Sequence, residues 1–269
     1  RKINSIREKL KQDLKNSKNN ETKKLESQEL LIKNISEYIN LQNKAQKLLT
    51  LQTPSKKQII EAQSLFKEAK RKKRSKESIL NRIEFHKKRI SDIEYCESFL
   101  ESLTYEDVNN NKLDSITELK EEVEEYISMK KVNPKFKSKK KKEQSSKIKE
   151  IQSPNGLKIQ IGGNNRQNEF ISLKQGKKGD LWFHAQEIPG SHVVLKSSNG
   201  FMDDKDMQLA ADLASFFSRA KGSKLVPVVM VPIENLQRIS GALPGTVRHR
   251  GGKVLWGKAD RAQKYFHQK

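Results

Sequence analysis

Two short polar segments in the second half of the chain carry the residue types from which a binding site could be built. The first segment, residues 161–169, ends an apolar run in two glycines that are followed by amide and guanidinium side chains. Glycine lets backbone N–H groups approach a phosphate closely, and Asn, Arg and Gln make paired hydrogen bonds to phosphate oxygens or base edges. The segment therefore predicts an RNA contact through Asn164, Asn165, Arg166, Gln167 and Asn168. The competing interpretation is an ordinary turn that side-chain hydrogen bonds close.

The second segment, residues 180–192, combines aromatic and histidine side chains with a Pro–Gly turn. In the strand that this segment predicts, Trp182 and His184 share one face, where exposed rings would stack on RNA bases. The competing interpretation places Trp182 and Phe183 in the core. After the turn, Ser191 and His192 either hydrogen-bond a phosphate or simply close the turn.

These residues do not form a pattern typical of an enzyme or a metal centre. Ser191 and His192 are adjacent, which is poor geometry for a nucleophile–base pair, and the sequence has no Gly-x-Ser-x-Gly elbow. The amide block lacks a Walker lysine and Gly-x-Gly-x-x-Gly spacing. His184, His192 and His249 have no cysteine partners and no metal-site spacing. We therefore expect no catalysis, no cofactor, no metal and no small-molecule substrate.

The composition indicates a polyanionic partner. The formal net charge is +22 over 269 residues, and only 33% of the residues are hydrophobic. RNA, DNA and an anionic membrane surface are the candidates, but no apolar run approaches the roughly 18 residues that a spanning helix needs. The single cysteine, Cys96, fits a reducing compartment such as the cytoplasm or a plastid stroma. Because the chain opens at Arg1 inside a helical pattern, we expect that it continues a longer protein.

Residues 1–130 predict a long antiparallel coiled-coil hairpin, called the arm below. From residue 79 to residue 103, apolar residues and His86 repeat at spacings of three and four, which is the seam of a coiled coil. A break at residues 53–55 separates the two helices, and Ser55 is a suitable N-cap for the returning one. The arm also carries a basic block, made of Lys70, Arg71, Lys72, Lys73 and Arg74.

This basic block has two interpretations, a solvated helix face or a section of the arm that contacts ribosomal RNA phosphate. Residues 101–125 are strongly acidic by contrast. The contrast favours an oriented arm whose basic section meets phosphate.

The composition changes after residue 130. Residues 131–150 predict a basic flexible linker, since nine lysines and one acid among residues 131–149 cannot bury a core. All thirteen glycines and both tryptophans lie beyond residue 150. There, short apolar runs predict strands at residues 157–161, 181–184, 192–195 and 226–231, and a helix is expected at residues 203–220. The sequence thus predicts an α+β fold, in which the helical arm precedes a compact domain of short antiparallel strands at residues 151–269.

The last part of this domain predicts a β-hairpin. Residues 246–250 and 253–257 flank Gly251-Gly252, a two-residue turn that tolerates positive φ. In that register a core-like face would be shared by Val247, His249, Val254 and Trp256. The opposite face would carry Leu255 and a basic ridge for RNA phosphate, made of Arg248, Arg250 and Lys253.

The two polar segments resemble the signature of the NFACT-R domain. The resemblance covers Asn-Asn-Arg-Gln-Asn-Glu at residues 164–169, Asp-x-Trp-Phe-His at residues 180–184 and Pro-Gly-Ser-His at residues 189–192. Residues 61–67 resemble a stretch of the middle coiled coil of the NFACT family, although Glu61 and Leu65 depart from the usual Asn and Tyr. The chain is therefore similar to the coiled-coil and carboxy-terminal parts of that family, and the family's amino-terminal domain is absent from it.

The resemblance implies a ribosome-associated quality-control factor that supplies positioning rather than chemistry. The implied partners are the large ribosomal subunit, with its rRNA and stalk-base proteins, tRNA, and the peptidyl-tRNA that still blocks the subunit after stalling. In such proteins the arm reaches toward the stalk base while globular domains hold tRNA. Bacterial members support the addition of a carboxy-terminal alanine tail by the ribosome's own peptidyl-transferase centre.

Two other functions stay open. An older name of the family, fibronectin-binding protein, implies an extracellular adhesin-like protein. Charge alone would also suit a nonspecific nucleic-acid binder. Preference for large subunits over duplex DNA and over fibronectin separates the three functions.

Overall fold

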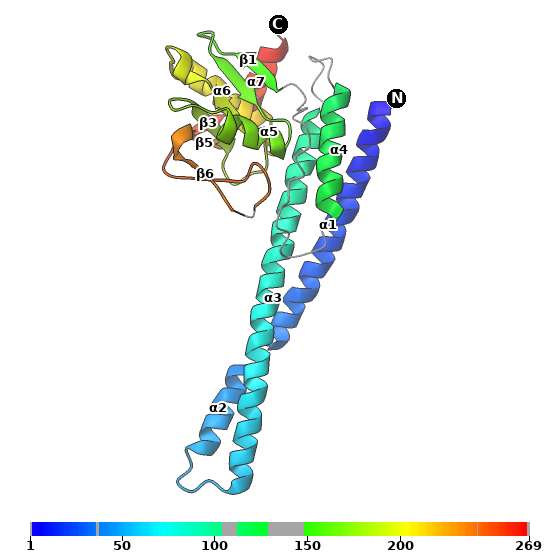
Figure 1. The fold of residues 1–269 in the computed structure, drawn as a ribbon, viewed down its shortest axis with the longest axis vertical. Helices are drawn as coiled ribbons and strands as arrows, with labels where there is room; N and C mark the ends of the chain where they lie inside the picture. The colour runs from blue at the N-terminus through cyan, green and yellow to red at the C-terminus, as the bar shows by residue number, and fades with distance from the viewer. Residues whose placement is uncertain (1, 36–37, 104–111, 129–147, 241, 268–269) are drawn as a thin grey trace. The chain divides into compact units, whose positions relative to one another are not determined.

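The computed structural model describes residues 2–35, 38–103, 112–128, 148–240 and 242–267 (Figure 1). The chain has two compact units. Residues 15–93 form one unit, and residues 1–14 together with residues 94–269 form the other. The helices α1 (Lys2–Ile35) and α3 (Lys56–Ser102) contribute to both units, because each crosses the boundary.

The unit of residues 15–93 is an antiparallel helical arm. The helices α1 and α2 (Tyr38–Leu49) come first, and α3 returns beside them. Ion pairs between the helices show that α3 runs antiparallel to α1 and α2: Oε1 of Glu29 is 3.5 Å from Nζ of Lys87, and Nζ of Lys44 is 3.7 Å from Oε1 of Glu61. The predicted helical hairpin is confirmed.

The seam of the arm follows the predicted heptad spacing. In α3, Ala62, Ala69, Ile79 and Ile93 are buried, and the positions between them at spacings of three and four are partly buried. His86 lies in this seam, with its Nδ1 2.6 Å from Oε2 of a buried glutamate on α1. An arm that buries one narrow seam and exposes its other faces accounts for the low hydrophobic content of the chain.

The helix α3 begins where its capping residue predicts. The hydroxyl of Ser55 accepts from the backbone N–H of Gln58 at 3.3 Å, and the Gln58 side chain accepts from the Ser55 N–H at 2.8 Å. This reciprocal pair is a capping box, which satisfies two of the N–H groups that a helix start leaves unpaired. The expectation for Ser55 is confirmed.

The second unit contains a six-stranded sheet in which every neighbouring pair is antiparallel. Across the sheet the strands are β1 (Lys149–Gln152), β2 (Lys158–Ile161), β4 (Val193–Leu195), β3 (Leu181–Ala185), β5 (Val226–Pro232) and β8 (Lys253–Gly257). The helices α6 (Asp204–Phe216) and α7 (Ala259–His267) follow β4 and β8 in the chain. Phe183 and Val228 of the sheet and Leu213 of α6 share the main core. The α+β fold class is confirmed.

A smaller core, which includes Trp182, Val194 and Val229, occupies the opposite face of the sheet. The short helix α5 (Asn165–Glu169) leads into a π-helical turn, η2 (Phe170–Lys174), whose Ile171 belongs to this core. Three further short elements are η3 (Ser197–Asn199), η4 (Ile233–Asn235) and the strand β6 (Leu236–Arg238), which pairs with β7 (Val247–His249) in a separate sheet. The helix α4 (Lys112–Ser128) precedes the whole domain in the chain. Of the predicted linker, residues 131–147 lie outside the described residues, while Lys149 and Glu150 begin β1.

The four predicted strands are confirmed, and the predicted helix at residues 203–220 is shorter than expected. It begins behind Asp203, whose carboxylate accepts from backbone N–H groups in a capping box with Asp206. It ends at Phe216, because the following residues pair with another segment: the carbonyl of Phe217 accepts from the N–H of Ser191 at 2.9 Å. Tertiary hydrogen bonds therefore end the helix four residues before the end predicted from the sequence.

The predicted hairpin at residues 246–257 is wrong, although its turn is where it was expected. Gly251 and Gly252 both have positive φ, at 65° and 122°. The strands they join, however, belong to different sheets, since β7 pairs with β6 and β8 pairs with β5. The register of β8 puts Leu255 opposite Val228 and against the main core. Because side chains alternate along a strand, Val254 and Trp256, which were predicted to share a core-like face, lie on the opposite face and are exposed.

Candidate nucleic-acid interface

The amide block of residues 164–168 first closes its own turn. Asn164 is the N-cap of α5, and its side-chain oxygen accepts from the Gln167 N–H at 2.8 Å. The side-chain oxygen of Gln167 accepts in turn from the N–H of Gly163 at 2.9 Å. These bonds are the local turn chemistry that the competing interpretation of the block anticipates.

The last residue of the block ties α5 to the loop that contains the second polar segment. Asn168 is buried, and its side-chain oxygen accepts from the His192 N–H at 2.9 Å. Its amide nitrogen lies 3.5 Å from the carbonyl of Gly190. A Cβ at Gly162 would lie 2.1 Å from this same side chain, so the glycine is required for the close approach. Asn168 thus links the two signature segments.

Glutamates of α4 cover the rest of the block. Glu118, Glu122 and Glu125 are spaced four and three residues apart, which places them on one face of that helix. A carboxylate oxygen of Glu118 lies 3.3 Å from Nδ2 of Asn164 and 3.4 Å from Nε2 of Gln167. The amide donors that were predicted to meet RNA therefore meet a carboxylate of the same chain.

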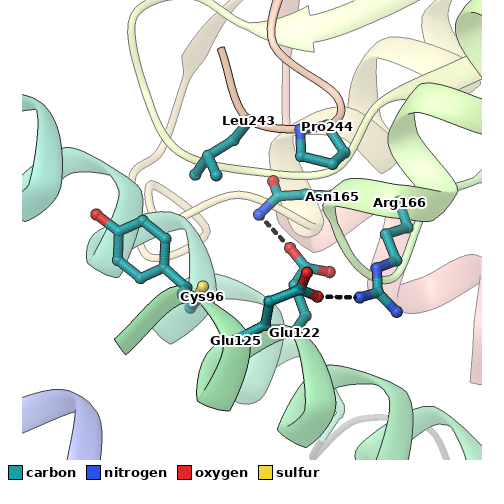
Figure 2. Close-up of a pocket in the computed structure, with 8 residues that line it drawn as sticks. Cys96, Glu122, Glu125, Asn165, Arg166, Leu243 and Pro244 are labelled. Carbon is teal, nitrogen blue, oxygen red and sulfur yellow. Dashed lines mark hydrogen bonds and ion pairs between the residues drawn. The ribbon is translucent and has the colours of Figure 1, made fainter. Parts of the chain in front are cut away.

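Figure 2 shows the other two glutamates on their partners. Nδ2 of Asn165 donates to Oε1 of Glu122 at 2.5 Å, and the guanidinium of Arg166 donates to Glu125 at 2.6 Å. These residues line a small pocket together with Cys96, which is buried. The three glutamates were not among the predicted site residues, and the signal for them was their helical spacing within the acidic stretch.

Burial raises the pKa of Glu122 to about 7, against an ordinary value of 4.5. The hydrogen bond from Asn165 and the charge of Arg166 act in the opposite direction and do not offset the burial. Within the described residues, Oε2 of Glu122 has no hydrogen-bond partner. The contact between α4 and the block therefore contains an acid that changes its charge near neutral pH.

Four of the five block residues are buried, and only Arg166 is exposed. An RNA contact through Asn164, Asn165, Gln167 or Asn168 requires movement of the segments that cover them. That contact stays a prediction. In the arrangement described here, the block holds together α4, α5 and the loop of residues 189–192.

The second polar segment is equally enclosed. Trp182 and His184 are buried and stack on each other, with ring centroids 5.5 Å apart and planes 16° apart. Tyr95 of α3 stacks on the second face of His184 at 6.3 Å. Ser191 and His192 are buried too, and Nδ1 of His192 is 2.8 Å from the hydroxyl of Ser172. The stacking predicted for Trp182 and His184 therefore takes place within the protein.

Burial also sets the charge of the two histidines. It lowers the pKa of His184 to about 4, and it lowers the pKa of His192 well below its ordinary value. Both rings are therefore neutral near pH 7. A neutral ring contributes no positive charge to a phosphate site, so cationic contacts must come from other residues.

Asp180, the first residue of the second segment, also bonds within the protein. Asp180 is fully buried, forms an ion pair with Lys196 and accepts from the hydroxyl of Ser198 at 2.6 Å. Burial alone would raise the pKa of Asp180, but hydrogen bonds from Lys196 and Ser198 lower it. The carboxylate therefore stays ionised and joins the starts of β3 and η3.

The hairpin that was predicted to place Arg248, Arg250 and Lys253 on one face is not formed, but all three side chains, still called the basic ridge, are exposed within residues 248–253. Arg248, Arg250 and Lys253 are all exposed, on β7, beside the glycine turn and at the start of β8. Among the residues that the structure describes, none of the three has a carboxylate partner. Their charges are therefore available to an external anion.

The other arginines of the domain differ from those of the ridge. Each of them lies within ion-pair distance of a carboxylate, at 2.6 to 3.4 Å: Arg166 with Glu125, Arg219 with Glu94, Arg238 with Glu169, and Arg261 with Asp212. Arginine is the side chain best suited to hold phosphate through two parallel hydrogen bonds. The unpaired Arg248 and Arg250 are thus the strongest phosphate candidates in residues 148–267.

The predicted ribosome-contacting block on the arm is also accessible. In α3, Lys70, Arg71, Lys73 and Arg74 are exposed, while Lys72 is partly buried and lies 3.6 Å from Glu68. The block is therefore a cationic helix surface in which one of the five charges is paired.

Comparison with known proteins identifies the globular domain. Residues 147–251 match the family described as the NFACT protein RNA binding domain. The chain belongs to the NFACT family. The match begins two residues before β1 and ends at Gly251, and so includes α5, the two polar segments and most of the basic ridge.

Relatives of this NFACT chain include the Rqc2 homolog RqcH of Bacillus subtilis, which is 34% identical over 160 residues. The match covers 59% of this chain and 26% of that protein. The Rqc2 homolog RqcH of Streptococcus pneumoniae is 34% identical over 197 residues, which are 72% of this chain and 33% of that protein. The chain thus spans about a quarter to a third of these relatives' length.

A solved structure resembles the chain along almost its entire length. It is the C-terminal part of the fibronectin/fibrinogen-binding protein from Streptococcus suis, with a TM-score of 0.74 and 29% sequence identity. The similarity covers 98% of this chain and 97% of the other. The combination of helical arm and α+β domain is therefore shared with that protein.

Two other kinds of feature are absent from the described residues. No group of three or more histidine, cysteine or acidic side chains there is arranged to hold a metal ion. No described helix is long and apolar enough to cross a membrane.

Proposed function

We propose that this NFACT chain binds RNA of the large ribosomal subunit and tRNA, as part of a ribosome quality-control factor. The observation that carries the proposal is the unpaired basic ridge within a domain of the NFACT RNA-binding family. Two of its cations are arginines, in a domain whose other arginines all meet carboxylates. A surface whose charges have no internal partner is available to a polyanion.

The arm adds a second surface of the same sign. The basic block of Lys70, Arg71, Lys73 and Arg74 is exposed on α3. Contacts of this kind fix position without reading sequence, because phosphate looks the same along any RNA. Two cationic surfaces on one chain suit a large RNA partner such as a ribosomal subunit.

The names of the relatives indicate the cellular process in which this binding would take part. Two of them are named as RqcH proteins and as homologues of Rqc2. We propose that the whole protein, like its family, acts on a large subunit blocked by peptidyl-tRNA and supports alanine tailing of the nascent chain. In this proposal the chain positions RNA and contributes no chemical step, which is supported by the burial of its Ser172–His192 pair.

Co-sedimentation with purified large subunits, intact ribosomes and duplex DNA over a salt series tests the proposal. The site variant combines Arg248→Ala, Arg250→Ala and Lys253→Ala. A matched control removes the same charge from three other exposed lysines of the domain, Lys174, Lys177 and Lys178. The chain should prefer large subunits at about physiological salt, and the site variant should lose far more affinity than the control.

Two outcomes would contradict the proposal. Equal binding to all polyanions, with equal losses in both variants, would leave a nonspecific nucleic-acid binder. Retention on immobilised fibronectin, without retention on large subunits, would instead favour the function that the name of the Streptococcus suis relative describes.

A further inference from the structure

The edge strand β8 exposes large apolar side chains. Val254 is 49% exposed and Trp256 is 56% exposed, whereas Leu255 between them packs against the main core. Side chains alternate along a strand, so Val254 and Trp256 lie on the same face. Among the described residues, β8 pairs only with β5 and has no strand on its other side.

The backbone of this strand is fixed even though its aromatic ring is exposed. The carbonyl of Trp256 accepts from Nε2 of Gln208 at 3.0 Å and from the guanidinium of Arg261 at 3.4 Å. The next residue, Gly257, is so close to α6 that a Cβ there would lie 2.5 Å from the carbonyl oxygen of Ala211. The indole is therefore an exposed ring on a rigid support.

The other tryptophan of the chain shows what the fold does with an indole that it needs for packing. Trp182 is 2% exposed and lies within the second core. Burying an aromatic side chain removes about 150–250 Å² from water, and Trp256, which is 56% exposed, forgoes much of that stabilisation. The position of Trp256 is thus better explained by an external partner than by folding.

We propose that Trp256, supported by Val254, is a stacking platform for an unpaired base of a single-stranded RNA segment. The phosphates of that segment would lie on the basic ridge. This inference rests on the function proposed above. Along β8, Lys253 is three residues, or about 10 Å of strand, from Trp256, and its side chain leaves the opposite face of the strand at the end next to the glycine turn. The match to the RNA-binding family ends at Gly251, so the platform extends the binding surface beyond the part of the domain that the family describes.

Charge complementarity favours single-stranded RNA over the other partners that could cover the exposed apolar side chains of β8. The residues that lead into β8 carry the unpaired cations, and an RNA strand supplies phosphate and an aromatic base face together. A second copy of the chain would bring two surfaces of a protein of net charge +22 together, which repulsion opposes. A duplex would offer its phosphates but keep its bases stacked inside.

The test uses the full chain of residues 1–269 and a short unstructured RNA, with a duplex of the same sequence for comparison. Wild-type fluorescence should be quenched by the single strand, because Trp256 is the exposed indole and Trp182 is buried. Trp256→Ala should weaken single-strand binding about 10-fold, since stacking of one base contributes about 1–3 kcal/mol. Trp256→Phe should keep the affinity within about three-fold, because a phenyl ring still stacks, while the quenching is lost.

A control variant and separate readouts distinguish the possible failures. Phe201 is 80% exposed and lies outside β8, so Phe201→Ala removes an exposed ring and should leave the affinity unchanged. If Trp256→Ala binds the single strand as the wild type does, the platform is wrong while the ridge proposal stands. If the wild type does not bind RNA, both fail. Dimers that dissociate in Trp256→Ala, with RNA affinity unchanged, would show that the strand joins two copies and would overturn the platform.

Discussion

Replacing Glu122 by Gln tests whether α4 packs on the amide block as the structure shows. Burial raises the pKa of Glu122 to about 7, while its ordinary value is 4.5. An acid whose pKa is raised on folding stabilises the fold below its unfolded pKa, and that stabilisation is lost as the pH rises through the folded value. The difference corresponds to about 3 kcal/mol between pH 4.5 and a pH well above 7.

Glu122→Gln should remove this pH dependence. Its side-chain oxygen can still accept from Asn165, and no carboxylate has to ionise in the buried site. We expect the variant and the wild type to unfold with similar free energies near pH 5. At pH 8 the variant should be more stable by about 2–3 kcal/mol. Guanidinium unfolding followed by circular dichroism, in steps from pH 5 to pH 8.5, measures the difference at each pH.

The matched control is Glu124→Gln, on the exposed side of α4. Its carboxylate lies 3.6 Å from Nζ of Lys120 and is largely exposed, so its neutralisation should change stability by less than about 0.5 kcal/mol at every pH. If Glu122→Gln shows the same pH profile as the wild type and the control, Glu122 is not buried and the contact between α4 and the block is wrong.

Three further predictions concern the basic ridge, His184 and Gly162. Arg248→Ala with Arg250→Ala should reduce the slope of log affinity against log salt by about 1.4–1.8 on RNA, measured by fluorescence anisotropy. Burial lowers the pKa of His184 to about 4, so its stabilisation, complete above pH 6.5, is lost as the pH falls toward 4. His184→Phe should flatten that acid side of the stability profile, as thermal unfolding at each pH will show. Gly162→Ala, whose methyl would meet a side-chain oxygen 2.1 Å away, should destabilise the chain by about 2 kcal/mol, while Gly222→Ala, with nothing within 4 Å, should not.

The parts of the fold that depend on local pattern could be predicted from the sequence. The seam around His86 follows from a spacing that any coiled coil requires, and the start of α3 follows from a capping residue with Gln58 three positions later. The strands β2, β3, β4 and β5 and the start of α6 were recoverable for the same reason, whereas β1, β6 and α7 were not predicted.

The features that the sequence could not supply depend on long-range pairing. A Gly-Gly turn between two short strands predicts a hairpin, but the partners of those strands, β5 and β6, are chosen by the whole sheet. That choice decides that Leu255 is partly buried and Trp256 exposed. Similarly, the hydrogen-bonding capacity of Asn165 was evident from its type, whereas its partner Glu122 lies 43 residues away in the chain.

Hydrogen exchange of the chain with and without large subunits tests the central claim most directly, because it maps where RNA binds without any substitution. Protection should be gained at residues 246–258, which carry the basic ridge and β8, while α5 under α4 should keep its exchange rates. Protection confined to α5, or to neither region while the chain remains bound, would contradict the assignment of the RNA interface to the ridge.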